Sequence, residues 1–209
     1  MFRFATLALL FVSAATPTPV LAGPGKFNKV LAPGDAAPAW EGLEGTDGKK
    51  HSLADLKDKE VVVVVFTCNS CPVAKDYEDR IVALAAAHAG PGSKVAVVAI
   101  NVNTGKDDAL PAMKVRAEKK KFPFAYLFDP TQEIARKYGA TFTPEFFVLG
   151  KDRTVLYAGA LDDKSPPEEP RAKFVEAAVA AALAGKKVEA AETSAAAGCR
   201  IKFNPKKDD

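Results

Sequence analysis

The chain has 209 residues, of which 48% are hydrophobic, and its 29 basic and 26 acidic residues give a formal net charge of +3. This length predicts one domain with tails. No stretch approaches the roughly 18 consecutive apolar residues of a membrane-spanning helix, and the small net charge predicts no extended basic surface. We therefore expect neither a membrane span nor a nucleic-acid partner.

Residues 1–22 have the three-part layout of a secretory signal peptide. Arg3 is followed by an apolar stretch over Thr6–Ala15 and a helix-breaking segment, Thr16–Pro19. The layout ends in Val20-Leu21-Ala22, with small residues at the positions that a signal peptidase reads. We expect cleavage after Ala22 and an exported protein, periplasmic or secreted. An apolar helix packed on the domain is the alternative. Export places the cysteines in an oxidising compartment, where disulfides persist.

The remaining chain is predicted to divide into three parts. Residues 23–38 are rich in Gly, Pro and Ala and are expected to form a linker. Residues 39–185 contain the regular elements and form the domain. Residues 186–209 are a tail of Ala, Lys and Glu that carries Cys199.

At the start of the domain, Asp47-Gly48 predicts a tight hairpin turn, because glycine readily adopts the positive φ that such turns need. Ser52, with Asp55 three residues later, resembles a capping box for a short helical turn at Leu53–Leu56. A small hairpin and one helical turn are therefore expected before the first long strand.

The run Val61–Phe66 predicts a strand that is buried on both faces, because it is short, apolar and rich in β-branched residues. Cys68-Asn69-Ser70-Cys71-Pro72 follows it directly. A proline suits the first turn of a helix, and apolar residues at helical spacing predict one amphipathic helix from there to His88. The two thiols are therefore expected where a strand passes into a helix.

Strands and helices alternate through the rest of the domain, which predicts a largely parallel sheet. The last two strands are joined by a short turn and predict an antiparallel hairpin. The predicted fold is α/β, with a mixed, mostly parallel sheet flanked by helices. The further strands are expected at 94–102, 124–128, 145–149 and 154–158, and the further helices after Asp108, from Asp129 to Gly139, and at 174–183.

The spacing of Cys68 and Cys71 predicts a dithiol that exchanges with other thiols. We expect Cys68 at the helix N-terminus, where amide hydrogens and the helix dipole stabilise a thiolate, and Cys71 close enough to resolve a mixed disulfide. A structural disulfide across so short a loop would constrain little. A structural zinc site needs four N or S ligands, and beyond this pair the chain offers only His51, His88 and Cys199. We therefore expect no metal.

Together, the buried strand, the Cys68–Pro72 motif, the helix after it and Thr143-Pro144 resemble the thioredoxin-like superfamily, and most closely the redoxin proteins of the alkyl hydroperoxide reductase/thiol-specific antioxidant (AhpC/TSA) group. The resemblance covers about residues 33–185. It implies that Pro144 is cis and that Thr143 and Pro144 position a substrate beside the cysteines. Glu145 is expected either to assist proton transfer at the thiols or to be a solvated carboxylate.

The sequence departs from peroxiredoxins, which carry a proline and a threonine seven and three residues before the peroxidatic cysteine. Counting back from Cys68, Val61 and Val65 stand at those positions, and counting back from Cys71, Val64 and Cys68 do. Copper chaperones on this fold use a downstream histidine, and none follows His88. Neither activity is therefore favoured.

We expect a thiol–disulfide oxidoreductase without a cofactor. Its predicted partners are protein thiols or disulfides and an unidentified electron donor or acceptor. The alternatives are a thiol-dependent peroxidase of peroxiredoxin type and a non-catalytic domain that binds a metal or a partner. Cys199 is left over from the pair, and is expected to be a free thiol, to pair with a partner or to act as a third redox cysteine.

Overall fold

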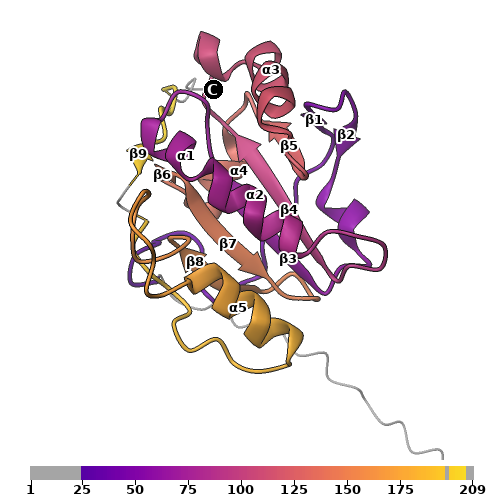
Figure 1. Cartoon of the computed structure of the whole chain (residues 1–209), viewed down its shortest axis with the longest axis vertical. Coiled ribbons are helices and arrows are strands. Elements are labelled where there is room, and N and C mark those ends of the chain that lie inside the picture. Colours follow the sequence, from indigo (N-terminus) through magenta and orange to yellow (C-terminus); the bar gives the residue numbers. More distant parts are fainter. Residues whose placement is uncertain (1–24, 196–197, 206–209) are drawn as a thin grey trace, which may run out of the picture.

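The structure is a computed structural model that describes residues 25–195 and 198–205. The predicted signal peptide lies outside the described residues. A seven-stranded sheet with the order β2-β1-β5-β4-β3-β7-β8 forms the centre of the molecule, and a separate two-stranded sheet joins β6 and β9 (Figure 1). The strands are β1 Leu43–Gly45, β2 Lys50–His51, β3 Val61–Phe66, β4 Val95–Asn101, β5 Ala125–Phe128, β6 Phe142–Thr143, β7 Glu145–Leu149, β8 Val155–Gly159 and β9 Cys199–Arg200.

Strand β3 lies inside the sheet, between β4 and β7, and all six of its residues are buried. It pairs in parallel with β4 and antiparallel with β7, so both of its edges are hydrogen-bonded. Strands β4 and β5 continue the parallel part, and β7 and β8 form the antiparallel hairpin. The predicted mixed sheet, with its C-terminal hairpin, is therefore confirmed.

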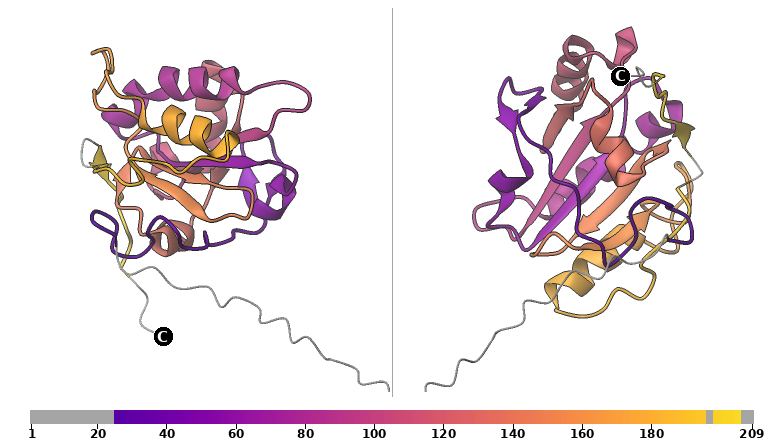
Figure 2. Two further views of the ribbon diagram at one scale, coloured as in Figure 1. Left: turned by 90° about the horizontal axis from the view of Figure 1, so that it is seen from below. Right: turned by 180° about the vertical axis from the view of Figure 1, so that it is seen from behind.

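Helices cover both faces of the sheet (Figure 2). Helices α2 and α5 lie on one face and the short helix α4 lies on the other. The 3-10 turn at Leu53–Leu56 and its Ser52–Asp55 capping box are present as predicted. The helices are α1 Pro72–Asp76, α2 Glu78–Ala87, α3 Leu110–Lys120, α4 Glu133–Tyr138 and α5 Phe174–Leu183, with 3-10 turns η1 Leu53–Leu56 and η2 Lys106–Asp108.

Alternation along β3 divides its side chains between two hydrophobic layers. Val61, Val63 and Val65 pack in the layer that contains α2 and α5. Val62, Val64 and Phe66 pack in the layer that contains α4. In the second layer, the rings of Phe66, Tyr138 and Phe147 meet edge to face with centroids 5.1–5.8 Å apart. An all-apolar strand is thus required here, because neither face of β3 meets water.

Two helix predictions need correction. The single helix expected after Cys71 is divided into α1 and α2 at Tyr77. Backbone hydrogen bonds still join Tyr77 to Val73 and Ile81 across the division. Helix α4 begins at Glu133 rather than near Pro130, because the residue before it, Gln132, has a left-handed φ of 62° that starts the helix later.

Described residues of both the predicted linker and the predicted tail pack against the domain. Within residues 23–38, Leu31 is only 5% exposed and belongs to the α4 layer, and the amide of Gly34 donates to Val155. In the tail, the Glu192 carboxylate accepts the amides of residues 26–28 at 2.6–2.8 Å, and Ile201 is buried in the same layer as Leu31. The compact unit therefore extends beyond residues 39–185 in both directions.

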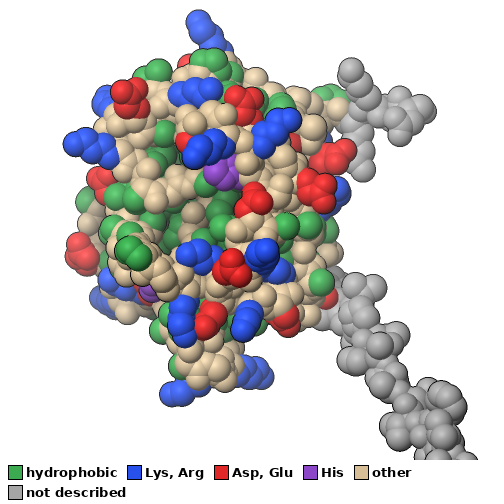
Figure 3. All heavy atoms as spheres, turned by 90° about the vertical axis from the view of Figure 1, so that its right-hand side faces the viewer, with side chains coloured by type: hydrophobic (Ala, Val, Ile, Leu, Met, Phe, Trp, Pro, Cys, Tyr) green, Lys and Arg blue, Asp and Glu red, His purple; other side chains and the backbone are tan. Residues whose placement is uncertain are grey.

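On the face shown in Figure 3, acidic and basic side chains are interspersed around a recess floored by hydrophobic ones. This face presents no block of a single charge. Among residues 25–195 and 198–205, no helix has the length and apolar character needed to cross a bilayer.

We predict that Phe147→Ala lowers the free energy of unfolding by about 3–5 kcal/mol, because it leaves a cavity between β3 and α4. Phe27→Ala is the matched control, since this ring is 46% exposed; it should cost no more than about 1 kcal/mol. Urea unfolding followed by circular dichroism measures both values. Equal losses in the two variants would contradict the assigned core.

Candidate active site

The two paired cysteines lie at the end of β3, where the chain turns into α1. Helix α1 begins at Pro72, so Cys71 rather than Cys68 is the N-cap residue, and its Sγ accepts the amide hydrogen of Ala74 at 3.3 Å. The expectation that Cys68 occupies the helix N-terminus is therefore wrong. The Cys71 sulfur accepts the kind of amide hydrogen bond that stabilises a thiolate at the start of a helix.

Thr143 contacts both sulfurs. Its Oγ1 lies 3.3 Å from the Sγ of Cys68, and its carbonyl oxygen accepts a hydrogen bond from the Cys71 thiol, also at 3.3 Å. The Thr143–Pro144 peptide bond is cis, as the family resemblance implies. The structure thus brings together four of the five predicted site residues, Cys68, Cys71, Thr143 and Pro144.

Glu145, the fifth predicted site residue, has different neighbours. Its Oε2 accepts the amides of Thr141 and Phe142 at 2.8 and 3.0 Å, and its side chain lines a cavity of about 430 Å³ between α4 and the tail. Burial raises the pKa of this carboxyl group, although the two amides oppose the shift. Glu145 is buried rather than solvated, and its described hydrogen bonds hold the backbone before Pro144 instead of reaching a thiol.

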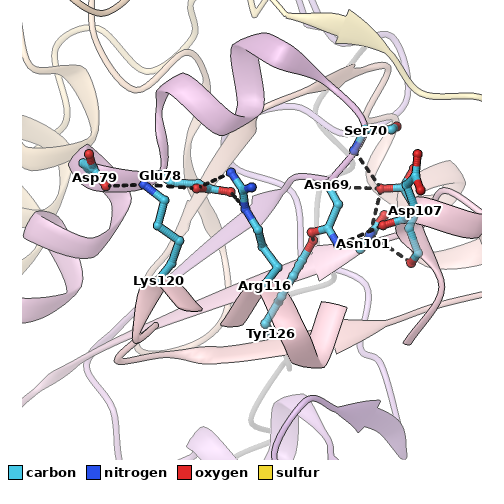
Figure 4. A network of polar contacts seen from close by, with 10 residues as sticks. Asn69, Ser70, Glu78, Asp79, Asn101, Asp107, Arg116, Lys120 and Tyr126 are labelled. Carbon is cyan, nitrogen blue, oxygen red and sulfur yellow. Dashed lines mark hydrogen bonds and ion pairs between the residues drawn. The ribbon is translucent and has the colours of Figure 1, made fainter. Parts of the chain in front are cut away.

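The loop between the cysteines belongs to a polar network in which Asn69, Ser70, Asn101 and Tyr126 lie close together (Figure 4). A buried carboxylate that no sequence motif marks, that of Asp108, holds this loop. The Oδ1 of Asp108, which is 2% exposed, accepts the amides of Asn69 and Ser70 at 2.7 and 3.1 Å. The side chain of Asn101 donates to the same oxygen, and Tyr126 donates to the side chain of Asn69. Asp108 thus fixes the loop and takes up two amide hydrogens beside Cys68.

These surroundings shift the pKa values of the two thiols in opposite directions. Burial raises the pKa of Cys68, with a further increase from the negative charge of Asp108, against the lowering effect of its hydrogen bond to Thr143. Burial also acts to raise the pKa of Cys71, but hydrogen bonds from Cys199 and Ala74 outweigh it and lower that pKa. In this arrangement Cys71 is therefore the thiol that ionises more readily.

The third cysteine lies beside the pair. Strand β9 pairs antiparallel with β6 and sets Cys199 opposite Thr143, next to α1 (Figure 1). The side chain of Cys199 packs against the cluster of Cys68, Cys71 and Ala74. Sequence reasoning had no signal for this contact, because a two-residue strand in an Ala-rich tail shows no periodicity.

All three cysteines are free thiols in the structure. Among the described residues, no group of three or more His, Cys, Asp or Glu side chains is arranged to hold a metal ion. The site, as described, consists of three sulfurs, the Thr143–Pro144 backbone and a polar support behind Asn69 and Ser70.

We predict that Asp108→Asn lowers the pKa of Cys68, because it removes the negative charge that disfavours the thiolate. In a Cys71→Ser background, Cys68 is the one cysteine between Lys59 and Lys75. The alkylation rate of that peptide, followed by mass spectrometry, should therefore rise at a lower pH than in the parent. Asp107→Asn, which changes the exposed neighbouring carboxylate, is the matched control. Identical profiles for both Asn variants would contradict the assigned role of Asp108.

We also predict a pH-dependent stability difference for Glu145→Gln. The pKa of Glu145 is raised in the folded state, so its contribution to stability is complete below the unfolded pKa and is lost as the pH rises through the folded pKa. Gln is neutral throughout and can still accept an amide hydrogen. The variant should gain stability relative to the parent in urea unfolding at pH 7, and the gain should shrink towards pH 4. A difference between variant and parent that does not vary with pH would refute this.

Comparison with known proteins places this site in a family. The model of the AhpC/TSA family matches residues 33–158. No curated protein gives a significant match. An uncharacterised conserved protein from Geobacillus kaustophilus has a similar structure, with a TM-score of 0.77, 34% sequence identity, and coverage of 90% of this chain and 100% of its own.

Two further solved structures extend the comparison. A hypothetical protein from Sinorhizobium meliloti has a TM-score of 0.75 and 30% identity, covering 85% of this chain and 98% of its own. A thiol-disulfide oxidoreductase from Bacteroides fragilis has a TM-score of 0.51 and 16% identity, covering 59% of this chain and 89% of its own, and shows a shared thioredoxin-like fold. Since the family model spans more than half of the chain and includes both cysteines of the pair, this protein belongs to the AhpC/TSA family of thioredoxin-like proteins.

Proposed function

We propose that the protein is a thiol–disulfide oxidoreductase that exchanges disulfides with protein or small-molecule thiols through Cys68 and Cys71. The observation that carries this proposal is the contact of one residue, Thr143, with both sulfurs at 3.3 Å, beside the cis peptide bond to Pro144. Two thiols held this close to one backbone segment can form a disulfide with each other and a mixed disulfide with a partner. The fold shared with the Bacteroides oxidoreductase supports the same activity.

The reaction needs a thiolate, because the thiolate is the nucleophile in disulfide exchange. The sequence predicts that Cys68 attacks and Cys71 resolves. The lowered pKa of Cys71 and the raised pKa of Cys68 favour the opposite order in the described arrangement. In either order, the first sulfur forms a mixed disulfide with the client, and the second displaces the client thiol and closes the Cys68–Cys71 bond.

We also propose that the protein acts after export. The layout of residues 1–22 supports a signal peptide that is cleaved after Ala22. The partners are then exported protein thiols or disulfides, together with an electron donor or acceptor in that compartment.

In a Cys199→Ser background, where Cys68 and Cys71 are the two remaining cysteines of the chain, the exchange proposal predicts that Cys68→Ser and Cys71→Ser each slow the catalysed reduction of a disulfide-bonded test peptide by dithiothreitol to the uncatalysed rate, because both sulfurs are needed for turnover. Circular dichroism checks that both variants are folded. Trapping then gives the order of attack: the variant that keeps the attacking sulfur should accumulate a mixed disulfide with the peptide. Wild-type turnover in both variants would refute the proposal.

Thiol-dependent peroxide reduction is the second candidate, and the AhpC/TSA family match favours it. The residues before each cysteine lack the peroxidatic pattern, with Val61 and Val65 preceding Cys68. Stopped-flow oxidation by hydrogen peroxide, run beside the exchange assay, separates the two. Oxidation no faster than that of a free thiol supports exchange, and oxidation orders of magnitude faster supports the peroxidase.

A further inference from the structure

The edge of β6 beside the cysteines is already occupied by the chain itself. Backbone next to a reactive site can bind an extended partner segment by adding a strand. Here β9 fills that place, with Cys199 paired to Thr143 and Arg200 paired to Phe142. A Cβ atom on Gly198 would clash with the carbonyl oxygen of Thr143, so the close approach of the two backbones requires glycine at this position.

The segment that carries β9 is anchored on both sides. Before it, the hydroxyl of Thr193 contacts that of Tyr157 at 2.6 Å, and the Thr193 amide donates to Ala158. After it, the amide of Ile201 donates to Thr141, and the buried Gln132 side chain donates to the carbonyl of Lys202 at 2.9 Å. Cys199 is therefore held beside the pair rather than carried on an unattached tail.

The three cysteines differ in their exposure to solvent. Cys68 and Cys71 are only 3% and 2% exposed, whereas Cys199 is half-buried. With β9 in place, solvent and external thiols reach Cys199 more readily than the pair. The Cys199 side chain packs against the cluster that contains Cys71, and its backbone pairs with Thr143, whose carbonyl oxygen accepts a hydrogen bond from the Cys71 thiol; the Cys71 and Cys199 side chains are therefore neighbours.

We propose that Cys199 is a third redox cysteine, which forms a disulfide with Cys71 and carries oxidising equivalents between the buried pair and thiols in solvent. This inference rests on the proposed exchange function of Cys68 and Cys71. In this proposal, β9 occupies the position beside β6 that an extended strand of a client protein would otherwise take.

The transfer is an internal exchange. In the oxidised pair, the Cys199 thiolate attacks the Sγ of Cys71; the Cys71–Cys199 bond forms as the Cys68–Cys71 bond breaks. Cys68 leaves with the electron pair and takes up a proton, which balances the proton lost by Cys199. No electrons enter or leave the protein in this step. An external dithiol then reduces the Cys71–Cys199 bond by two successive exchanges and departs as a disulfide.

Disulfide mapping of the purified protein tests the pairing. Cys68→Ser and Cys71→Ser variants are oxidised with diamide, free thiols are blocked with N-ethylmaleimide, and non-reduced tryptic peptides are analysed by mass spectrometry. Residues 60–75 carry the pair and residues 188–200 carry Cys199. We expect the cross-link between these peptides to be the main product in Cys68→Ser and severalfold less abundant in Cys71→Ser. No cross-link in Cys68→Ser, or equal yields in both variants, would overturn the assignment.

A second pair of variants tests whether β9 holds Cys199 beside Cys71, by changing a glycine rather than a cysteine. Adding Gly198→Ala to Cys68→Ser should lower the cross-link severalfold, because the new Cβ displaces β9 from Thr143. Gly105→Ala is the control, since its Cβ would meet no atom closer than 4.0 Å. Unchanged cross-linking in Gly198→Ala would count against the proposal.

The mapping requires no client. If the Cys71–Cys199 cross-link forms but the protein has no exchange activity, the proposed function is refuted and the pairing of Cys199 stands. If the protein has exchange activity but no cross-link forms, the proposed redox role of Cys199 is refuted and the proposed function stands.

Discussion

Strand β3 can be buried on both faces only because β4 and β7 pair with its two edges and satisfy its backbone hydrogen-bonding groups. This pairing determines the position of the site. The chain leaves the end of β3 into the cysteine loop, and β7 begins beside the same end, at Glu145, which is paired with Phe66. Pro144 and Thr143 therefore lie next to the cysteines as a consequence of sheet register.

The support behind the loop explains why two neighbouring cysteines have unlike surroundings. Asp108 accepts the amides of Asn69 and Ser70, so hydrogens that a Cys68 thiolate could have used are bound to a carboxylate instead. Cys71 caps a helix and has a thiol partner in Cys199. The surroundings of the loop thus disfavour a negative charge on the Cys68 sulfur and favour one on the Cys71 sulfur, although the two cysteines are only three positions apart.

The sequence alone predicts those features that depend on residues close together along the chain. The valine run, the Ser52–Asp55 capping box and the β7–β8 turn each carry a local pattern, and each is present in the structure. In the sequence, Asp108 is visible only as an acidic residue before a predicted helix. Its contact with the cysteine loop has no sequence pattern, because its two amide partners lie 38 and 39 residues away. The packing of residues 28–38, 191–195 and 198–204 has no sequence signal for a related reason: it depends on scattered single contacts, such as those of Leu31 and Glu192, rather than on a periodic face.

The position of β9 in the chain has a consequence for biosynthesis. A polypeptide is made from its N-terminus, so β3, the cysteine loop, β6 and every strand of the seven-stranded sheet are synthesised before β9. During that interval the β6 edge is open and the Cys68–Cys71 pair lacks its cover. Until β9 pairs with β6, a nascent chain therefore presents its dithiol directly to other thiols and disulfides, and the pairing of β9 ends this period of direct access.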